Sequence, residues 1–252
     1  MSTVTSIKKE SNSPTASYKL NSGTAVLACI IYFLTPALYL GIEYYVSLDY
    51  APSYSYRTHY TSQLAVPDEY VERNTGRTAF SPRAHLMNYM FIANGLLYLI
   101  GQRLLLGCFD KTLQLATTRI FLAMGHCIGF ILVAAVPGGP KQEEAGIAWV
   151  HFVGALLAIV MGNVNSLITG IVTPQWGLHK IISLACGTVG LCSTVLFFLS
   201  VGRGPSPGLW QRLSLYPTQL WMFFTADMLM AEISKLMKEL DKEEEAKMKK
   251  QE

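Results

Sequence analysis

Six apolar segments, each long enough to cross a lipid bilayer as a helix, restrict the fold of this chain more than any other feature. A membrane-spanning helix needs about 20 predominantly apolar residues, because the hydrocarbon core of a bilayer is about 30 Å thick. The segments are Gly23–Val46, Ala84–Leu106, Thr112–Ala135, Ile147–Val172, Lys180–Val201 and Ser214–Met237. Only 15% of the 252 residues are charged, against about 25% in an average soluble domain. The sequence therefore predicts an all-α, polytopic membrane helix bundle with six transmembrane helices.

The segments leave room for one membrane domain and two short tails. We expect a polar N-terminal tail over residues 1–22, a six-span domain over 23–237 and a charged C-terminal tail over 238–252. Short connections make consecutive helices antiparallel neighbours, which predicts an up-and-down bundle. The loop over 47–83 is the long exception, and it is rich in tyrosine. Such a loop is expected either to lie as an aromatic belt at the membrane surface or to fold as a cap over a cavity.

Basic residues are divided unevenly between the two sides of the predicted bundle. Six spans place both termini on one side of the membrane. The segments on that side carry twelve Lys and Arg residues, six of them after Glu232, whereas the opposite loops carry seven. Because cytosolic segments are enriched in Lys and Arg, this difference predicts that both termini are cytosolic and that the long loop faces the lumen.

The chain ends in Lys249-Lys250-Gln251-Glu252, which places lysines at the fourth and third positions from the end. This pattern resembles the dilysine retrieval signal of endoplasmic-reticulum membrane proteins, an address that a cytosolic coat protein recognises. The whole tail is rich in Lys and Glu, so a chance match in a solvated helix is the competing interpretation. The resemblance predicts the endoplasmic-reticulum membrane as the location, with another endomembrane or the plasma membrane as the alternative.

Ionisable side chains are rare inside the predicted spans, where such groups usually face the bundle interior or a cavity. Four remain once those near the span ends are set aside: Arg119, His126, His151 and Asp227. Arg119 and His126 are seven residues apart and therefore share one face of a helix. Asp227 lies near the middle of the sixth span, where a carboxylate must find a partner or stay protonated. Arg119 and His126 are its candidate partners.

His126, His151 and Asp227 are the candidate catalytic residues. Two histidines and an aspartate could bind a divalent metal that activates water against a lipid ester or phosphoester. Alternatively, a protonated Asp227 and a nearby histidine could act as a general acid-base pair. The competing interpretation is a structural polar core whose hydrogen bonds are all satisfied. The sequence leaves the metal, and any other cofactor, unknown.

Small residues line one face of the fourth predicted span. Gly154, Ala158, Gly162 and Asn165 follow His151 at helical spacing. A stripe of this kind lets a neighbouring helix approach closely, and packing alone is sufficient to explain it.

Several short motifs, taken in their order along the chain, resemble the family catalogued as domain of unknown function 998. The resemblance covers about residues 58–169. It is carried by His59-Tyr60-Thr61-Ser62-Gln63-Leu64, Asn88, Gly95, Gly125, Val136-Pro137-Gly138 and His151-Phe152-Val153-Gly154-Ala155. The family tends to show Ser-Asp-Leu-Gly in the loop, so Gln63 stands where an aspartate is typical. The resemblance implies a six-span fold with a lumenal cluster of Ser62, Asn88 and His151, and it implies no particular reaction.

Five residues are candidates for contacting a substrate on the lumenal side: His59, Ser62, Asn88, Arg119 and Gln219. With the tyrosine-rich loop, they favour a membrane lipid as the partner. We therefore expect a multi-pass protein that processes or remodels a lipid from the lumenal side of the endoplasmic reticulum. A transporter or binder of small molecules or lipids, and a non-catalytic assembly factor, are the alternatives. Nucleic acid is not expected as a partner, because the basic residues lie at membrane edges.

Overall fold

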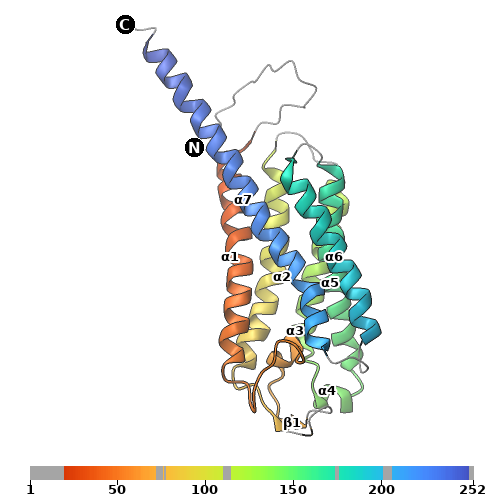
Figure 1. Cartoon of the computed structure of the whole chain (residues 1–252). Helices are drawn as coiled ribbons and strands as arrows, with labels where there is room; N and C mark the ends of the chain where they lie inside the picture. Colours follow the sequence, from red (N-terminus) through yellow and green to blue (C-terminus); the bar gives the residue numbers. More distant parts are fainter. Residues whose placement is uncertain are drawn as a thin grey trace.

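The computed structural model describes residues 20–71, 76, 78–109, 115–173, 176–200 and 206–249. The described residues are mostly helical, and the long helices run side by side in one elongated bundle (Figure 1). These helices are α1 (Ser22–Ser47), α2 (Ala84–Gly107), α3 (Ala116–Ala135), α5 (Ala148–Val172), α6 (Leu178–Ser200) and α7 (Pro207–Met248). A short helix, α4 (Pro140–Glu144), connects α3 to α5.

Five of these helices, α1, α2, α3, α5 and α6, are long and apolar enough to cross a membrane. They coincide with the first five predicted spans, which confirms the expectation of an all-α, multi-pass membrane bundle. The sixth predicted span, Ser214–Met237, lies within α7, which is 42 residues long and more polar than the other five. The helix begins at Pro207 rather than at Ser214, seven residues before the predicted apolar span. Proline is well suited to the first turn of a helix, because its missing N–H has no partner there.

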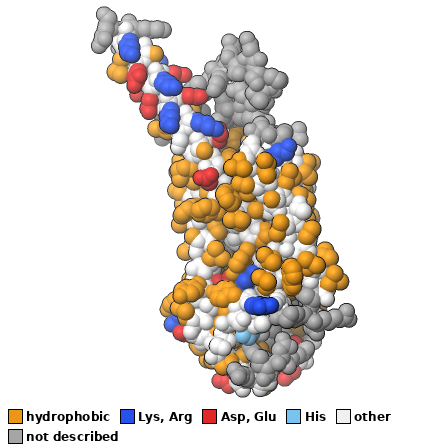
Figure 2. Space-filling view, viewed as in Figure 1, with side chains coloured by type: hydrophobic (Ala, Val, Ile, Leu, Met, Phe, Trp, Pro, Cys, Tyr) orange, Lys and Arg blue, Asp and Glu red, His pale blue; other side chains and the backbone are white. Residues whose placement is uncertain are grey.

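The side-chain distribution on α1 is typical of a helix that faces lipid. The small residues Ala25 and Ala28 and the aromatic Tyr32 are fully buried, whereas Leu27 and Phe33 are about half exposed. Figure 2 shows the same pattern on one face of the molecule, where hydrophobic side chains cover most of the bundle and most charged side chains lie toward its two ends. Large apolar residues on the outside and small residues at helix contacts indicate packing in a bilayer.

Consecutive helices are neighbours in space, as the short connections predicted. α1 packs on α2, α2 on α3, α3 on α5, and α5 on α6. α7 then packs on both α6 and α1, which closes the helices into a ring (Figure 1). Most of its polar side chains within the bundle face inward. The buried ones are Gln211, Arg212, Ser214, Thr218, Gln219 and Thr225.

The small-residue stripe on α5 packs against α3, as its spacing indicated. Gly154, Ala158 and Gly162 are all buried. A Cβ atom added at Gly129 of α3 would lie 2.3 Å from the Ala158 nitrogen, a distance that no real side chain could occupy. The two backbones are therefore in direct contact at this crossing.

The described part of the long loop folds as a cap over one end of the bundle (Figure 1). It contains a 3₁₀ helix, η1 (Thr61–Ala65), and a two-stranded antiparallel ribbon of β1 (Tyr70–Val71) and β2 (Thr78–Ala79). η1 packs on α1, α2 and α7, and its residues Leu64 and Ala65 are fully buried. The opposite end of the bundle carries the extension of α7, which runs beyond the other helices (Figure 1).

The predicted tails are described only in part. Residues 1–19 lie outside the described residues. α7 continues as a helix past Met237 to Met248, so the predicted charged tail is helical over its described part up to Met248. Lys249 is the last residue described, and Lys250 lies outside.

Candidate functional site

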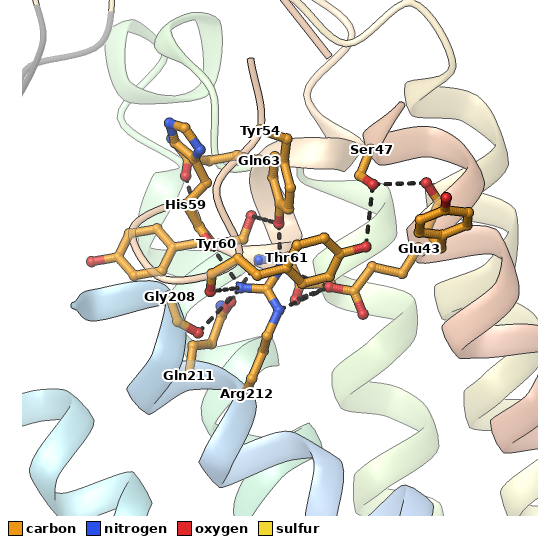
Figure 3. A network of polar contacts seen from close by, with 12 residues as sticks. Glu43, Ser47, Tyr54, His59, Tyr60, Thr61, Gln63, Gly208, Gln211 and Arg212 are labelled. Atoms are coloured by element: carbon orange, nitrogen blue, oxygen red, sulfur yellow. Dashed lines mark hydrogen bonds and ion pairs between the residues drawn. The ribbon is translucent and has the colours of Figure 1, made fainter. Parts of the chain in front are cut away.

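A buried ion pair fixes the cap to the bundle. The guanidinium group of Arg212, on α7, contacts the carboxylate of Glu43, on α1, at 2.7 Å between Nη2 and Oε1 (Figure 3). The Arg212 Nε atom also donates to Glu43 Oε1, at 3.1 Å. The two side chains are 5% and 1% exposed. Removing two charges from water is costly, and such a pair persists only when further hydrogen bonds satisfy both groups.

The remaining donors of Arg212 bind the loop and the first turn of α7. Nη1 donates to the backbone carbonyls of Tyr56 and His59, each at 2.8 Å, and to that of Gly208 at 3.2 Å. Nη2 donates to the Tyr54 hydroxyl. The guanidinium carbon lies 4.6 Å from the centre of the Tyr56 ring, which adds a cation–π contact. Arg212 therefore holds loop, α7 and α1 together at one point.

The Glu43 carboxylate accepts two further hydrogen bonds. Its Oε2 atom accepts a hydrogen bond from the Tyr216 hydroxyl at 2.7 Å, and Oε1 accepts one from the Thr61 hydroxyl at 3.0 Å. Burial raises the pKa of Tyr54, so this phenol stays neutral and donates to the Tyr60 carbonyl at 3.0 Å. We call Glu43, Arg212, Tyr54, Thr61 and Tyr216 the loop clamp. Its polar atoms are mutually paired, so it has the properties of a structural lock.

An apolar groove begins beside the loop clamp. Its volume is about 640 Å³, and residues of α1, α6 and α7 line it. The lining includes Pro36, Ala37 and Leu40 of α1, Val189 of α6, and Tyr216, Pro217, Gln219 and Leu220 of α7. Leu40, Val189 and Leu220 are about half exposed, so the groove opens onto the apolar belt. Tyr216 belongs to both features, because its ring lines the groove and its hydroxyl binds Glu43.

Proline residues on two helices help to shape the groove. Pro36 lies inside α1 and Pro217 inside α7. A proline inside a helix lacks the N–H that would bond the preceding turn, and its ring pushes that turn away. Both prolines line the groove.

The structure does not bring the three candidate catalytic residues together. His126 is fully buried, and its Nδ1 atom pairs with the Ala158 carbonyl at 2.6 Å. The Nδ1 atom of His151 pairs with the carbonyl of Val136 at the end of α3, at 2.8 Å. Asp227 was expected in the interior, but its side chain is exposed on the outer face of α7. No group of three potential metal ligands occurs within the described residues.

The five candidate substrate contacts are also spread through the molecule. His59 lies in the cap, where its Nδ1 atom accepts a hydrogen bond from the Ser55 nitrogen, and Ser62 is half-buried in η1. Asn88 donates to the Ala65 carbonyl at 2.8 Å and so supports the cap from α2. Gln219 donates to Asn94 Oδ1 at 3.1 Å inside the bundle. Arg119 lies near the opposite end, on the first turns of α3, and is not part of a cluster at the cap.

Sequence reasoning missed Glu43 and Arg212, the two charged residues that form the buried ion pair. Glu43 is among the ionisable residues set aside near the span ends, and Arg212 is one of the seven basic residues of the opposite loops. Both lie at the same end of the bundle, on the first and last helices. An acidic residue in one span and a basic residue beside another, on the same side of the membrane, is the signal that would have paired them.

The fold and the loop clamp define a class: a polytopic helical membrane protein whose long loop is fixed over one end of the bundle by a buried ion pair. The chain belongs to the family described as protein of unknown function DUF998, whose sequence pattern matches residues 22–226. The match extends from α1 into α7 and confirms the resemblance seen over a shorter part of the sequence. No curated protein and no solved structure is similar enough to match the chain.

Proposed function

We propose that this protein binds a membrane lipid, with an acyl chain in the groove and the polar headgroup beside the loop clamp. The observation that carries this proposal is the continuity of the groove with the clamp through Tyr216. Acyl chains surround the apolar belt in a membrane, so a lipid is the occupant that the groove meets first. The polar cap at one end of the groove then suits the headgroup of the same molecule.

The orientation of this site follows from the charges. We propose that α7 is the sixth span and that both termini are cytosolic, so that the cap and the end of the groove beside the loop clamp lie on the lumenal side. α7 supports this because it packs along α1 and α6, and its polar side chains within the bundle are mostly buried. The excess of Lys and Arg on the side of the termini supports the same orientation.

The endoplasmic reticulum is the proposed location, and the pair Lys249 and Lys250 is its support. In this orientation the lysines are available to a cytosolic coat protein. We infer a role in lipid processing or remodelling in which this chain holds the lipid. Because His126, His151 and Asp227 lie apart, we favour a role in binding the lipid over a role in which these three residues cleave it.

Filling the groove tests lipid binding directly. Ala37 lines the groove, whereas its neighbour Leu38 is about half exposed and does not. Wild type, Ala37→Phe and Leu38→Phe would be purified in a mild detergent and analysed by native mass spectrometry. We expect a phospholipid adduct on wild type and Leu38→Phe that is strongly reduced on Ala37→Phe. Equal adducts on all three proteins, or none on wild type, would contradict the proposal.

A further inference from the structure

Arg119 is a buried cation in the half of the bundle opposite the cap, and no residue that the structure describes is paired with it. It lies one turn from the start of α3 at Ala116, and its side chain is fully buried. All three of its guanidinium nitrogens lack a hydrogen-bond partner among the residues that the structure describes. Within the described residues, no carboxylate forms an ion pair with Arg119, in contrast to Arg212 at the other end.

A buried guanidinium group needs acceptors, because it carries five N–H donors and remains charged inside a protein. An uncompensated charge in the interior is one of the costliest features a fold can contain. When such a group is retained in a packed core, the balancing negative charge has to come from elsewhere. A bound anion is one way to supply it.

The polar neighbours of Arg119 direct their hydrogen bonds to one another. Arg119 interacts electrostatically with the hydroxyl groups of Tyr32 and Tyr98 and with the ring of His179. The Tyr32 hydroxyl donates to Gln102 Oε1 at 3.2 Å, and His179 Nε2 pairs with the Thr225 hydroxyl at 2.9 Å. None of these groups carries a negative charge. The described surroundings of Arg119 therefore provide polarity but no counterion.

Gln102 adds a second unused donor to this region. Its Oε1 atom accepts hydrogen bonds from Tyr32 and from Asn165 Nδ2, whereas its Nε2 atom is buried without a partner. Asn165 Oδ1 is a buried acceptor without a partner in the same network, but a neutral amide oxygen does not balance a full positive charge. The N-terminal turn of α3 contributes a further partial positive charge.

We propose that Arg119 and Gln102 form a binding site for an oxyanion, a carboxylate or a phosphate group. A guanidinium group matches two oxygens of such an anion through two parallel N–H bonds, and the free Gln102 donor would hold a further oxygen. Arg119 is about 5 Å along the helix axis from the first residue of α3, so the site is close to one end of the bundle. It is separate from the loop clamp and does not depend on lipid binding in the groove.

Two sources of the oxyanion share this chemistry. One is a free carboxylate or phosphate that enters from the water at this end of the bundle. The other is the headgroup of an anionic lipid in the adjacent leaflet. The test therefore measures thermal unfolding of the whole chain in two settings: in a zwitterionic detergent with added sodium phosphate or acetate, and in phosphatidylcholine nanodiscs with or without phosphatidic acid. Sodium chloride at equal ionic strength is the comparison for the soluble salts.

Arg119→Gln removes the site, and Arg103→Gln is the matched control, because Arg103 is an exposed arginine near the same end of the bundle. A ligand at about 100 times its Kd should raise the unfolding temperature of wild type and Arg103→Gln by about 5–10 °C. Arg119→Gln should show no such rise. In the absence of anions it should unfold at a higher temperature than wild type, because the unpaired charge is gone.

A rise with phosphate or acetate assigns the site to a soluble oxyanion, and a rise only with phosphatidic acid assigns it to a headgroup. If none of the three anions stabilises wild type more than chloride does, the proposal is wrong. It is equally wrong if Arg119→Gln responds as wild type does. Should Arg119→Gln fail to fold, Arg119→Lys keeps the charge but loses the two parallel bonds. A weaker anion affinity in Arg119→Lys is then expected, and an unchanged affinity would refute the proposal.

Discussion

Arg212 Nη2 lies 2.7 Å from Glu43 Oε1, although 169 residues separate the two along the chain. The pair joins the first long helix to the last, and the hydrogen bonds of Arg212 to the Tyr56 and His59 carbonyls bring the loop to the same point. Closing the helix ring and ordering the cap are therefore coupled. A lipid headgroup beside the clamp would meet a surface that exists only when both have happened.

Breaking this pair should be strongly destabilising. Glu43→Gln keeps the shape of the side chain but leaves the Arg212 charge buried without a counterion, which costs about 3–5 kcal/mol. Asp49→Asn is the matched control, because Asp49 pairs with Arg83 at 2.6 Å while the two side chains are 41% and 28% exposed. An exposed pair contributes about 0–1 kcal/mol. The stability of both variants is measured by thermal unfolding in detergent. A similar loss of stability in the two would contradict the greater cost expected for breaking the buried pair.

The approach of α7 to the cap depends on a glycine. A Cβ atom at Gly208 would lie 2.2 Å from the His59 carbonyl oxygen, which is backbone and cannot rotate away. Gly208→Ala should therefore push the loop off α7 and increase cleavage of the cap by an added protease. Gly41→Ala is the control, because no atom lies within 4 Å of a Cβ atom there. It should leave cleavage unchanged and stabilise α1 slightly, by up to about 1 kcal/mol. Equal cleavage of both variants would show that Gly208 tolerates a side chain.

The helices were predictable because a spanning helix must satisfy its own backbone hydrogen bonds and needs a minimum apolar length. α7 shows where this reasoning loses accuracy. Its first two turns contain the polar residues Gln211 and Arg212, whose side chains bind the cap instead of water. Asp227 shows a second gap: the position of a residue in a span indicates its depth, but only the packing of α7 determines which face it occupies.

The candidate site was harder to predict than the fold. His126 and His151 were selected because ionisable groups in spans are rare, and both bind backbone carbonyls of a neighbouring segment. The clamp depends on contacts between the loop, α1 and α7, and no periodicity in the sequence relates such distant positions. The small-residue stripe of α5 was predictable because it depends on helical spacing alone.

The contact between α3 and α5 should be sensitive to a single methyl group. At Gly129 an added Cβ atom would meet the Ala158 nitrogen at 2.3 Å, so Gly129→Ala forces the two helices apart. Overpacking of this kind costs about 1–3 kcal/mol. Gly125→Ala is the control on the same helix, because its nearest neighbour would be the flexible side chain of Met161, at 2.9 Å. Gly129→Ala should unfold at a clearly lower temperature than Gly125→Ala. The reverse order of unfolding temperatures would refute the tight crossing of α3 and α5.

The last prediction concerns the end of the chain, where the proposed address and a merely charged helix differ in outcome. If Lys249 and Lys250 form a retrieval signal, replacing both with Ser should release the protein from the endoplasmic reticulum to later compartments. Replacing Lys242 and Lys247 with Ser removes the same charge from the same tail and should leave the location unchanged, because a retrieval signal is read by position. Fluorescence microscopy of chains tagged at the N-terminus, which leaves the C-terminus free, distinguishes the two. Retention of both variants would show that the lysines are not the address, whereas release of both would assign the effect to charge.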